Sequence, residues 1–407
     1  MSNTTKSILT LLLGSALALP IGADARPQSF HHARGSTLAL RLADRFSEVT
    51  VPARHQPRRG KTAHQRPLLD TSSTIIDEPD ADPTLYGTRV RGTNDTGQLS
   101  GQYVDSSGAF HAFIATPNGN SFTYTPITVK RNDTFGFLLN EKGAMFGSYD
   151  EKHSGIENSW IRQPNGKLEI VALPEGPGGT IIQGLNNKGV ATGNYFDANG
   201  AFRGFLRDKQ GHVTDFDDPL AGSGENQGTN PIGINDSGEI SGIVFDSNDV
   251  AHGFIRHAGD GSFVEYDVPD AGSAPGQGTL GLEIENDGWI TGAYVDANNV
   301  SHGFLRDPDG NILAPIDPPD MGTNPFQGVV GVEHLEKGWA VGEYIDQDDV
   351  LHGFLCKKCE TAERKIVEFD APGAVDTFNV LSSNRQHQIV GSFHDENGIR
   401  HGFIRNP

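Results

Sequence analysis

Short runs of apolar residues, separated by turns rich in glycine, asparagine and aspartate, fill the chain from residue 71 onward. In one stretch they lie near residues 232–235, 239–245, 251–256 and 263–268. Such runs, bounded by turn residues, are typical of β-strands. No helical periodicity of apolar positions runs through this region. The pattern therefore predicts an all-β fold.

Three short motifs recur along this region. A glycine, an apolar or aromatic residue and an aspartate return seven times, 45 to 50 residues apart, at Asp105, Asp150, Asp197, Asp246, Asp296, Asp346 and Asp395. A His-Gly-Phe tripeptide or a variant of it follows about six residues later, beginning at His111, Arg203, His252, His302, His352 and His401. An apolar-Asp-x-Pro motif comes third, with its aspartate at positions 217, 267, 317 and 370. Four strands in such a period match one blade of a β-propeller.

The two ends of the repeat region complement each other. The seventh copy stops after its third strand, at Arg405, while Ile76-Asp77-Glu78-Pro79 carries the fourth-strand motif. A linear array would need a capping unit at each end, whereas a ring needs none. We therefore predict a seven-bladed β-propeller of four-stranded blades, closed by an N-terminal strand that completes the last blade. The first strand of each copy is expected to be innermost.

The N-terminal segment predicts export. Lys6 precedes an apolar run over residues 8–21, and Ala23-Asp24-Ala25 fits a signal-peptidase site. We expect a signal peptide over 1–25, a basic and mostly flexible leader over 26–70 with one helix near 36–49, and the propeller over 71–407. The protein would then be secreted or periplasmic. The apolar run is too short for a membrane span.

Charge narrows the range of partners. The chain has a formal net charge of −20, and nine basic against three acidic residues in 26–70 leave −26 on residues 71–407. A body this acidic repels nucleic acid and anionic lipid. The expected partners are a carbohydrate, a cation or a basic protein surface, bound by a monomer.

The tripeptide His111-Ala112-Phe113 and its His-Gly-Phe relatives resemble the HAF family of extracellular repeat proteins. The resemblance covers residues 71–407 through all seven copies, although the second copy has diverged to Ser159-Trp160-Ile161. It implies a secreted repeat protein, and it supplies no catalytic residues.

The repeated residues have two interpretations each. The histidines suggest a metal or acid–base role, but copies in separate blades cannot converge on one ion, so packing and hydrogen bonding are preferred. The seven aspartates fit turns that they cap themselves. Alternatively they form an acidic binding ring on one face, and their Asp-x-Asn start resembles a calcium loop. No cofactor is predicted, with calcium as the alternative.

Acidic residues that break the repeat are the candidates for catalysis. Glu283 and Glu333 lie 50 residues apart, at equivalent positions of the expected inner strands, and Glu285, His334 and Glu336 are nearby. Paired carboxylates beside a histidine could act as general acid and base on a polysaccharide. The alternative interpretation is a hydrated channel that tolerates charge, and it is preferred.

Cys356 and Cys359 fall where two strands of the sixth copy should turn, and in an oxidising compartment they predict a local disulfide. No nucleophile elbow or phosphate loop is present. The sequence therefore favours a secreted module that binds a carbohydrate, a cation or a basic protein. The alternative is an extracellular polysaccharide hydrolase or lyase that uses Glu283, Glu333 and His334.

Overall fold

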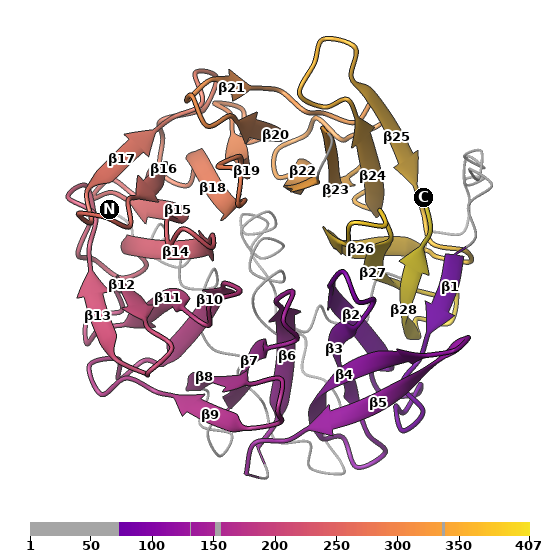
Figure 1. The fold of residues 1–407 in the computed structure, drawn as a ribbon. Helices are drawn as coiled ribbons and strands as arrows, with labels where there is room; N and C mark the ends of the chain where they lie inside the picture. The colour runs from indigo at the N-terminus through magenta and orange to yellow at the C-terminus, as the bar shows by residue number, and fades with distance from the viewer. Residues whose placement is uncertain (1–72, 131, 151–155, 336–337) are drawn as a thin grey trace, which may run out of the picture.

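The computed structural model describes residues 73–130, 132–150, 156–335 and 338–407, and these residues form strands, turns and loops without any helix. The predicted signal peptide, leader and leader helix lie outside the described residues. The all-β prediction is confirmed. Figure 1 shows the strands arranged around a common centre.

Backbone pairing organises the strands into antiparallel units of four, which we number as copies 1 to 7 in chain order. The first strand of each unit lies nearest the centre in Figure 1, and these inner strands are β2 (Thr88–Thr93), β6 (Thr134–Leu139), β10 (Thr180–Leu185), β14 (Gly228–Ile234), β18 (Gly278–Ile284), β22 (Gly328–Leu335) and β26 (Asp376–Ser383). The second strands are β3 (Leu99–Val104), β7 (Met145–Asp150), β11 (Ala191–Phe196), β15 (Ile240–Phe245), β19 (Ile290–Val295), β23 (Trp339–Ile345) and β27 (Ile389–His394).

The outer half of each unit completes the meander. The third strands are β4 (Phe110–Asn118), β8 (Glu157–Arg162), β12 (Phe202–Arg207), β16 (Ala251–Arg256), β20 (Ser301–Arg306), β24 (Leu351–Lys357) and β28 (Arg400–Arg405). The fourth strands are β5 (Ser121–Ile127), β9 (Leu168–Val171), β13 (Val213–Phe216), β17 (Phe263–Tyr266), β21 (Ile312–Leu313), β25 (Lys365–Phe369) and β1 (Ser73–Ile76).

The N-terminal strand β1 is the fourth strand of copy 7. It pairs antiparallel with β28, with Thr74 opposite Ile404 and Ile76 opposite Gly402. Figure 1 shows this pairing as the indigo β1 beside the yellow β28. The two ends of the described chain therefore share one sheet.

The hydrogen-bonded ladder is not continuous around the molecule. Parallel bridges join copies 2 to 6 into a 20-stranded sheet, while copy 1 and copy 7 each form a separate four-stranded sheet. A ring closed by unbroken strand pairing is therefore not what the structure shows. Copies 7 and 1 adjoin through side chains instead: Ser392 Oγ accepts the Val90 N–H at 3.0 Å, and Ser382 Oγ accepts the Thr93 N–H at 3.1 Å.

A relay of hydrogen bonds connects the turns between first and second strands. The Asp95 N–H donates to Glu141 of the next copy at 2.9 Å, and the Asp236 N–H donates to Asn286 at 2.7 Å. The same contact links copies 2 to 3 and 3 to 4. Arg385 of copy 7 donates its N–H to Asp95 of copy 1 at 2.8 Å. The relay therefore also joins the last copy to the first, at the end of the inner strands that we call the turn face.

The hydrophobic core lies between neighbouring units. Ile76 and Ile404 of copy 7 pack with Val90, Leu99 and Phe113 of copy 1 in one cluster. The phenylalanines of the His-Gly-Phe motif and its variants are completely buried, namely Phe113, Phe205, Phe254, Phe304, Phe354 and Phe403. Trp160 takes this place in the diverged copy 2. The repeat motif therefore supplies one large core residue to each unit.

Candidate functional site

The repeated aspartates cap the turns between second and third strands. Asp246 Oδ1 accepts the N–H groups of Asn248 at 2.8 Å and Val250 at 2.9 Å. The same pair of hydrogen bonds occurs at Asp105, Asp197, Asp296, Asp346 and Asp395. Asp150 differs, because it is a completely buried residue at the end of β7 and the turn after it lies outside the described residues.

The second oxygen of each capping aspartate faces the histidine of the same copy. In copy 6, His352 Nε2 lies 3.2 Å from Asp346 Oδ2, and His352 Nδ1 lies 2.7 Å from Asp370 Oδ1. Asp370 is the aspartate of the apolar-Asp-x-Pro motif at the end of β25. We call this arrangement the Asp–His–Asp clamp, since the imidazole joins the turn to the end of the fourth strand.

The clamp recurs around the molecule. His252, His302 and His401 hold Asp267, Asp317 and Asp77 at 2.8 to 2.9 Å. On their other side the capping aspartates lie 3.8 to 3.9 Å away, an ion-pair distance rather than a hydrogen bond. In copy 3, Arg203 replaces the histidine and bonds both Asp197 and Asp217. In copy 7 the clamp spans the two ends of the described chain, because Asp77 directly follows β1 while His401 belongs to β28.

Hydrogen bonds within the clamp shift the pKa of individual members. Partial burial tends to raise the pKa of Asp346, but hydrogen bonds from His352 and the Val350 N–H outweigh it and lower that pKa below its usual value. Burial tends to lower the pKa of His302, yet its hydrogen bond to Asp317 leaves that pKa raised. The oxygens of the capping aspartates are thus already used within the protein. Within the described residues, no group of three or more His, Cys, Asp or Glu side chains could hold a metal ion.

The most accessible carboxylates lie at the other end of three of the clamps. The side chains of Asp77, Asp217 and Asp267 are 50%, 38% and 52% exposed, against 19% and 20% for the capping Asp197 and Asp246. Asp317 and Asp370 are less accessible, at 21% and 30%. The predicted binding ring named only the capping residues. The apolar-Asp-x-Pro motif was the signal in the sequence for the more exposed set.

These accessible carboxylates share one face, which we call the loop face. It consists of the turns between second and third strands and the crossings from each fourth strand to the next inner strand, opposite the turn face. In copies 4 to 6 a glutamine of the crossing forms a hydrogen bond to the turn between the second and third strands. The pairs are Gln227–Asp249, Gln277–Asn299 and Gln327–Asp349, at 2.7 to 3.1 Å. Those three acceptors have φ of 63° to 64°, a left-handed conformation that Asn and Asp tolerate. The loop face is therefore held rigid.

Charge is divided between the two faces. In the described part of the loop face, Lys130 is the only lysine or arginine within a turn or crossing, and Arg203 and Arg400 stand at the adjoining strand starts. The turn face instead collects many basic residues, among them Lys142, Lys188, Lys209, Lys358, Arg364 and Arg385. The acidity of residues 71–407 is therefore concentrated on the loop face.

The inner-strand glutamates lie between corresponding pairs of the two copies. Gly278–Val295 and Ile284–Ile290 flank Glu283, and Gly328–Ile345 and His334–Ala340 flank Glu333, each 50 residues further on. Only the point of the β-bulge differs, since Glu333 pairs with Val341 whereas Glu283 falls in the irregular stretch after the Gly281–Gly292 pair. The His334 side chain lies outside what the structure describes, and a catalytic role for these residues remains a prediction.

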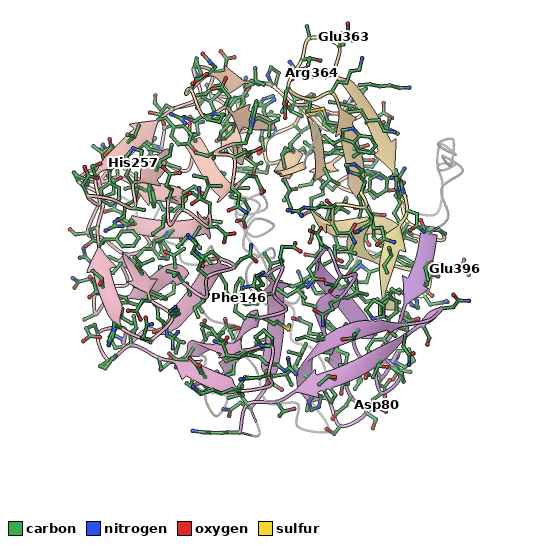
Figure 2. The ribbon with its side chains drawn as sticks, viewed as in Figure 1. Asp80, Phe146, His257, Glu363, Arg364 and Glu396 are labelled. Atoms are coloured by element: carbon green, nitrogen blue, oxygen red, sulfur yellow. A yellow bond between two sulfur atoms is a disulfide. The ribbon has the colours of Figure 1, made fainter. Side chains whose placement is uncertain are left out.

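A disulfide joins Cys356 at the end of β24 to Cys359 in the turn that follows, and both cysteines are buried. Figure 2 shows Glu363 and Arg364 at the tip of the hairpin beyond it. Arg364 donates to the Pro315 carbonyl at 2.9 Å, so this hairpin contacts copy 5. The disulfide and this contact support a structural role for the pair.

Comparisons with known proteins identify the fold. No family model and no curated protein sequence matches the chain. Among solved structures, streptogramin B lyase matches with a TM-score of 0.51 at 14% identity, covering 82% of this chain and 98% of that one. The BP39L lectin from Burkholderia pseudomallei matches with a TM-score of 0.50 at 12% identity, covering 78% and 96%. These matches show a β-propeller-like fold. Within the described residues no helix has the length and apolarity to cross a membrane.

Proposed function

We propose that the chain is an exported, seven-bladed β-propeller of the HAF type that binds a saccharide on its loop face. The seven four-stranded units, the β1–β28 pairing and the turn relay from Arg385 to Asp95 support the ring. Side-chain contacts rather than strand pairing would then close it between copies 7 and 1. The signal-like residues 1–25 support export.

Repetition of the same rigid carboxylate around the loop face carries this proposal. Asp217, Asp267 and the less exposed Asp317 each follow a fourth strand, and each is fixed by the Arg or His of its own copy. A fixed hydrogen-bond acceptor at the same place in successive copies suits a polymeric ligand whose chemical units also repeat. A polysaccharide that contacts several copies at once would gain affinity through multivalency.

Saccharide hydroxyl groups match these acceptors chemically. A carboxylate accepts hydrogen bonds through two oxygens, and its bonds to neutral donors are stronger than those between neutral groups. The solved lectin named above has a similar fold, which agrees with this choice. The clamp carboxylates and imidazoles are engaged with one another, so we do not assign them a catalytic role.

The test measures binding of the full chain to a panel of neutral polysaccharides, followed by calorimetry on those that bind. We expect several equivalent weak sites per chain and no release of reducing or unsaturated ends. Asp217→Asn, Asp267→Asn and Asp317→Asn keep their hydrogen bonds as isosteres, so each alone should weaken binding less than threefold. The triple variant should weaken it at least tenfold.

Asp309→Asn on the turn face is the matched control and should bind like the unmodified chain. A triple variant that binds as well as this control would contradict the proposal. Product release abolished by Glu283→Gln and Glu333→Gln would instead establish the hydrolase or lyase alternative.

A basic protein surface is the second candidate partner, favoured by the segregation of charge onto the loop face. Salt separates the two candidates, since exposed charge pairs are largely screened at high ionic strength. Binding to a neutral saccharide should change less than twofold between 50 mM and 500 mM NaCl. Loss of binding over that range, together with binding to polylysine, would favour the protein partner.

A further inference from the structure

The junction between copies 7 and 1 carries a cluster found in no other described copy. Arg400 begins β28, where Ala251, Ser301 and Leu351 begin the third strands of copies 4 to 6. Its guanidinium carbon lies 3.8 Å from the centre of the Tyr86 ring and 5.2 Å from that of Phe378. Arginine thus stacks between an aromatic residue of the first crossing and one of the last inner strand.

A histidine and an aspartate fix the guanidinium in this place. His394 Nδ1 lies 3.0 Å from both carboxylate oxygens of Asp376, and Arg400 Nε donates to His394 Nε2 at 3.3 Å. Because Nε2 accepts this hydrogen bond, the ring proton resides on Nδ1 and faces Asp376. Neither residue follows the repeat: five copies have glycine at or next to the position of Asp376, and no other has histidine at that of His394.

Arg400 has donors left over after these contacts. Its Nη1 atom is buried and makes no hydrogen bond with the described residues. No carboxylate of the described chain forms an ion pair with it, although it adjoins the acidic face. Arg203, the other arginine at this face, has two such partners, Asp197 and Asp217. Because Nε bonds His394 and Nη1 is buried, Nη2 is the donor that suits an external carboxylate oxygen.

Exposed aliphatic side chains flank the cluster. Leu85, directly before Tyr86, is 53% exposed, and Val375, directly before Asp376, is 48% exposed. The Val375 N–H donates to the His394 carbonyl at 2.8 Å, which places this residue beside the histidine. The other exposed large apolar residues of the described chain, apart from Leu220 and Ile156, lie on outer strands. Two exposed apolar residues therefore directly precede residues of this cluster in the chain.

We propose that this cluster, the closing joint (Leu85, Tyr86, Val375, Phe378, His394 and Arg400), binds a carboxylate that is attached to an apolar group. Arg400 would take the carboxylate, and Leu85 and Val375 would contact the apolar part. The surrounding acidic face would repel a polyanion more strongly than a ligand with a single negative charge. This site is separate from the saccharide contacts proposed above and does not depend on them.

The test uses N-acetyl-leucine and its uncharged analogue N-acetyl-leucinamide as probes on the full chain, with binding followed by NMR or calorimetry. We expect a dissociation constant of about 1 mM for the acid, as suits so small a ligand, and at least tenfold weaker binding of the amide. Arg400→Met should abolish the preference for the acid. Arg203→Met, which removes the doubly paired arginine, should leave that preference unchanged.

Variants at the two exposed residues test the proposal without disturbing the fold. Leu85→Ser and Val375→Ser change no buried residue, so the melting temperature should stay within about 1 °C, since surface substitutions usually alter stability little. Acid binding should weaken about threefold in each. Equal binding of acid and amide, or unchanged acid binding in Arg400→Met, would overturn the proposal. Galacturonate binding as tightly as N-acetyl-leucine would overturn the role of the apolar border.

Discussion

Gly242→Ala should be among the most destabilising single substitutions in this protein, with an expected loss of about 3 kcal/mol. Gly242 belongs to the glycine-aromatic-Asp motif and lies in β15. A methyl group there would overlap the Asn230 carbonyl oxygen of β14 and the buried Phe254 ring of β16. Neither can withdraw, because the carbonyl belongs to a paired strand and Phe254 is completely buried.

Urea unfolding followed by tryptophan fluorescence measures this loss as a fall in the transition midpoint. Gly259→Ala is the matched control, since an added methyl at Gly259 meets no atom within 4 Å. That variant should match or slightly exceed the unmodified chain, because alanine lowers the entropy of the unfolded state. Equal midpoints for the two variants would contradict the packing described for the motif.

Asp218→Asn should stabilise the protein at neutral pH by about 2 to 3 kcal/mol, which follows from a pKa difference of about two units. Asp218 is 3% exposed. Its burial, with Glu265 nearby, raises its pKa to about 6 from an ordinary value near 3.8. The folded state therefore binds this proton more tightly than the unfolded state does. Its contribution to stability is complete below about pH 4 and is lost as the pH rises through 6.

An asparagine never ionises and can still accept the Leu220 N–H, which Asp218 Oδ1 accepts at 2.8 Å. The free energy of unfolding of the variant should thus exceed that of the unmodified chain at pH 7.5 and equal it at pH 4. Urea unfolding across this pH range measures the difference. Asp270→Asn, at an exposed place in the next crossing, should give no pH-dependent difference. If the Asp218→Asn variant is less stable than the unmodified chain at pH 7.5, burial does not raise the pKa of Asp218 in the folded state.

The strand pattern was predictable wherever apolar residues mark it. In copy 4 the third strand was placed correctly at 251–256, and the fourth was expected at 263–268 but ends at Tyr266. The inner strand was expected from residue 232 but begins at Gly228. Gly228 and Pro231 argue against a strand when read in isolation. In the structure, Gly228 pairs with Phe245, and a bulge after Pro231 accommodates the missing donor.

The clamp could be predicted only in parts. The histidines were assigned to packing and hydrogen bonding, and the aspartates to turn capping, from residue type alone. Their partnership was not predicted, since His252 and Asp267 lie 15 residues apart and His401 and Asp77 lie 324 apart. Only the pairing of third and fourth strands brings each couple together.

The site proposed at Arg400, like the catalytic candidates, lies where the repeat is broken, but the sequence did not indicate which departure to choose. It directed attention to Glu283 and Glu333 in copies 5 and 6. Arg400 passed unnoticed, because its position varies among Ala, Ser, Leu, Phe and Glu and so has no consensus to break. Its partner His394 is only six residues away, on the neighbouring strand. Tyr86 lies far away in the sequence, and it meets Arg400 only because copy 7 adjoins copy 1.

Cross-linking of β1 to β28 tests the central claim, that the N-terminal strand completes the seventh copy. Thr74 is opposite Ile404 in the observed register, so Thr74→Cys with Ile404→Cys should form a disulfide under mild oxidation. Ile255 holds the equivalent place in β16 of copy 4. Thr74→Cys with Ile255→Cys should give no such bond. A linked peptide pair in the first variant alone, found by mass spectrometry after proteolysis, is the predicted result, and absence of the 74–404 link would contradict the account.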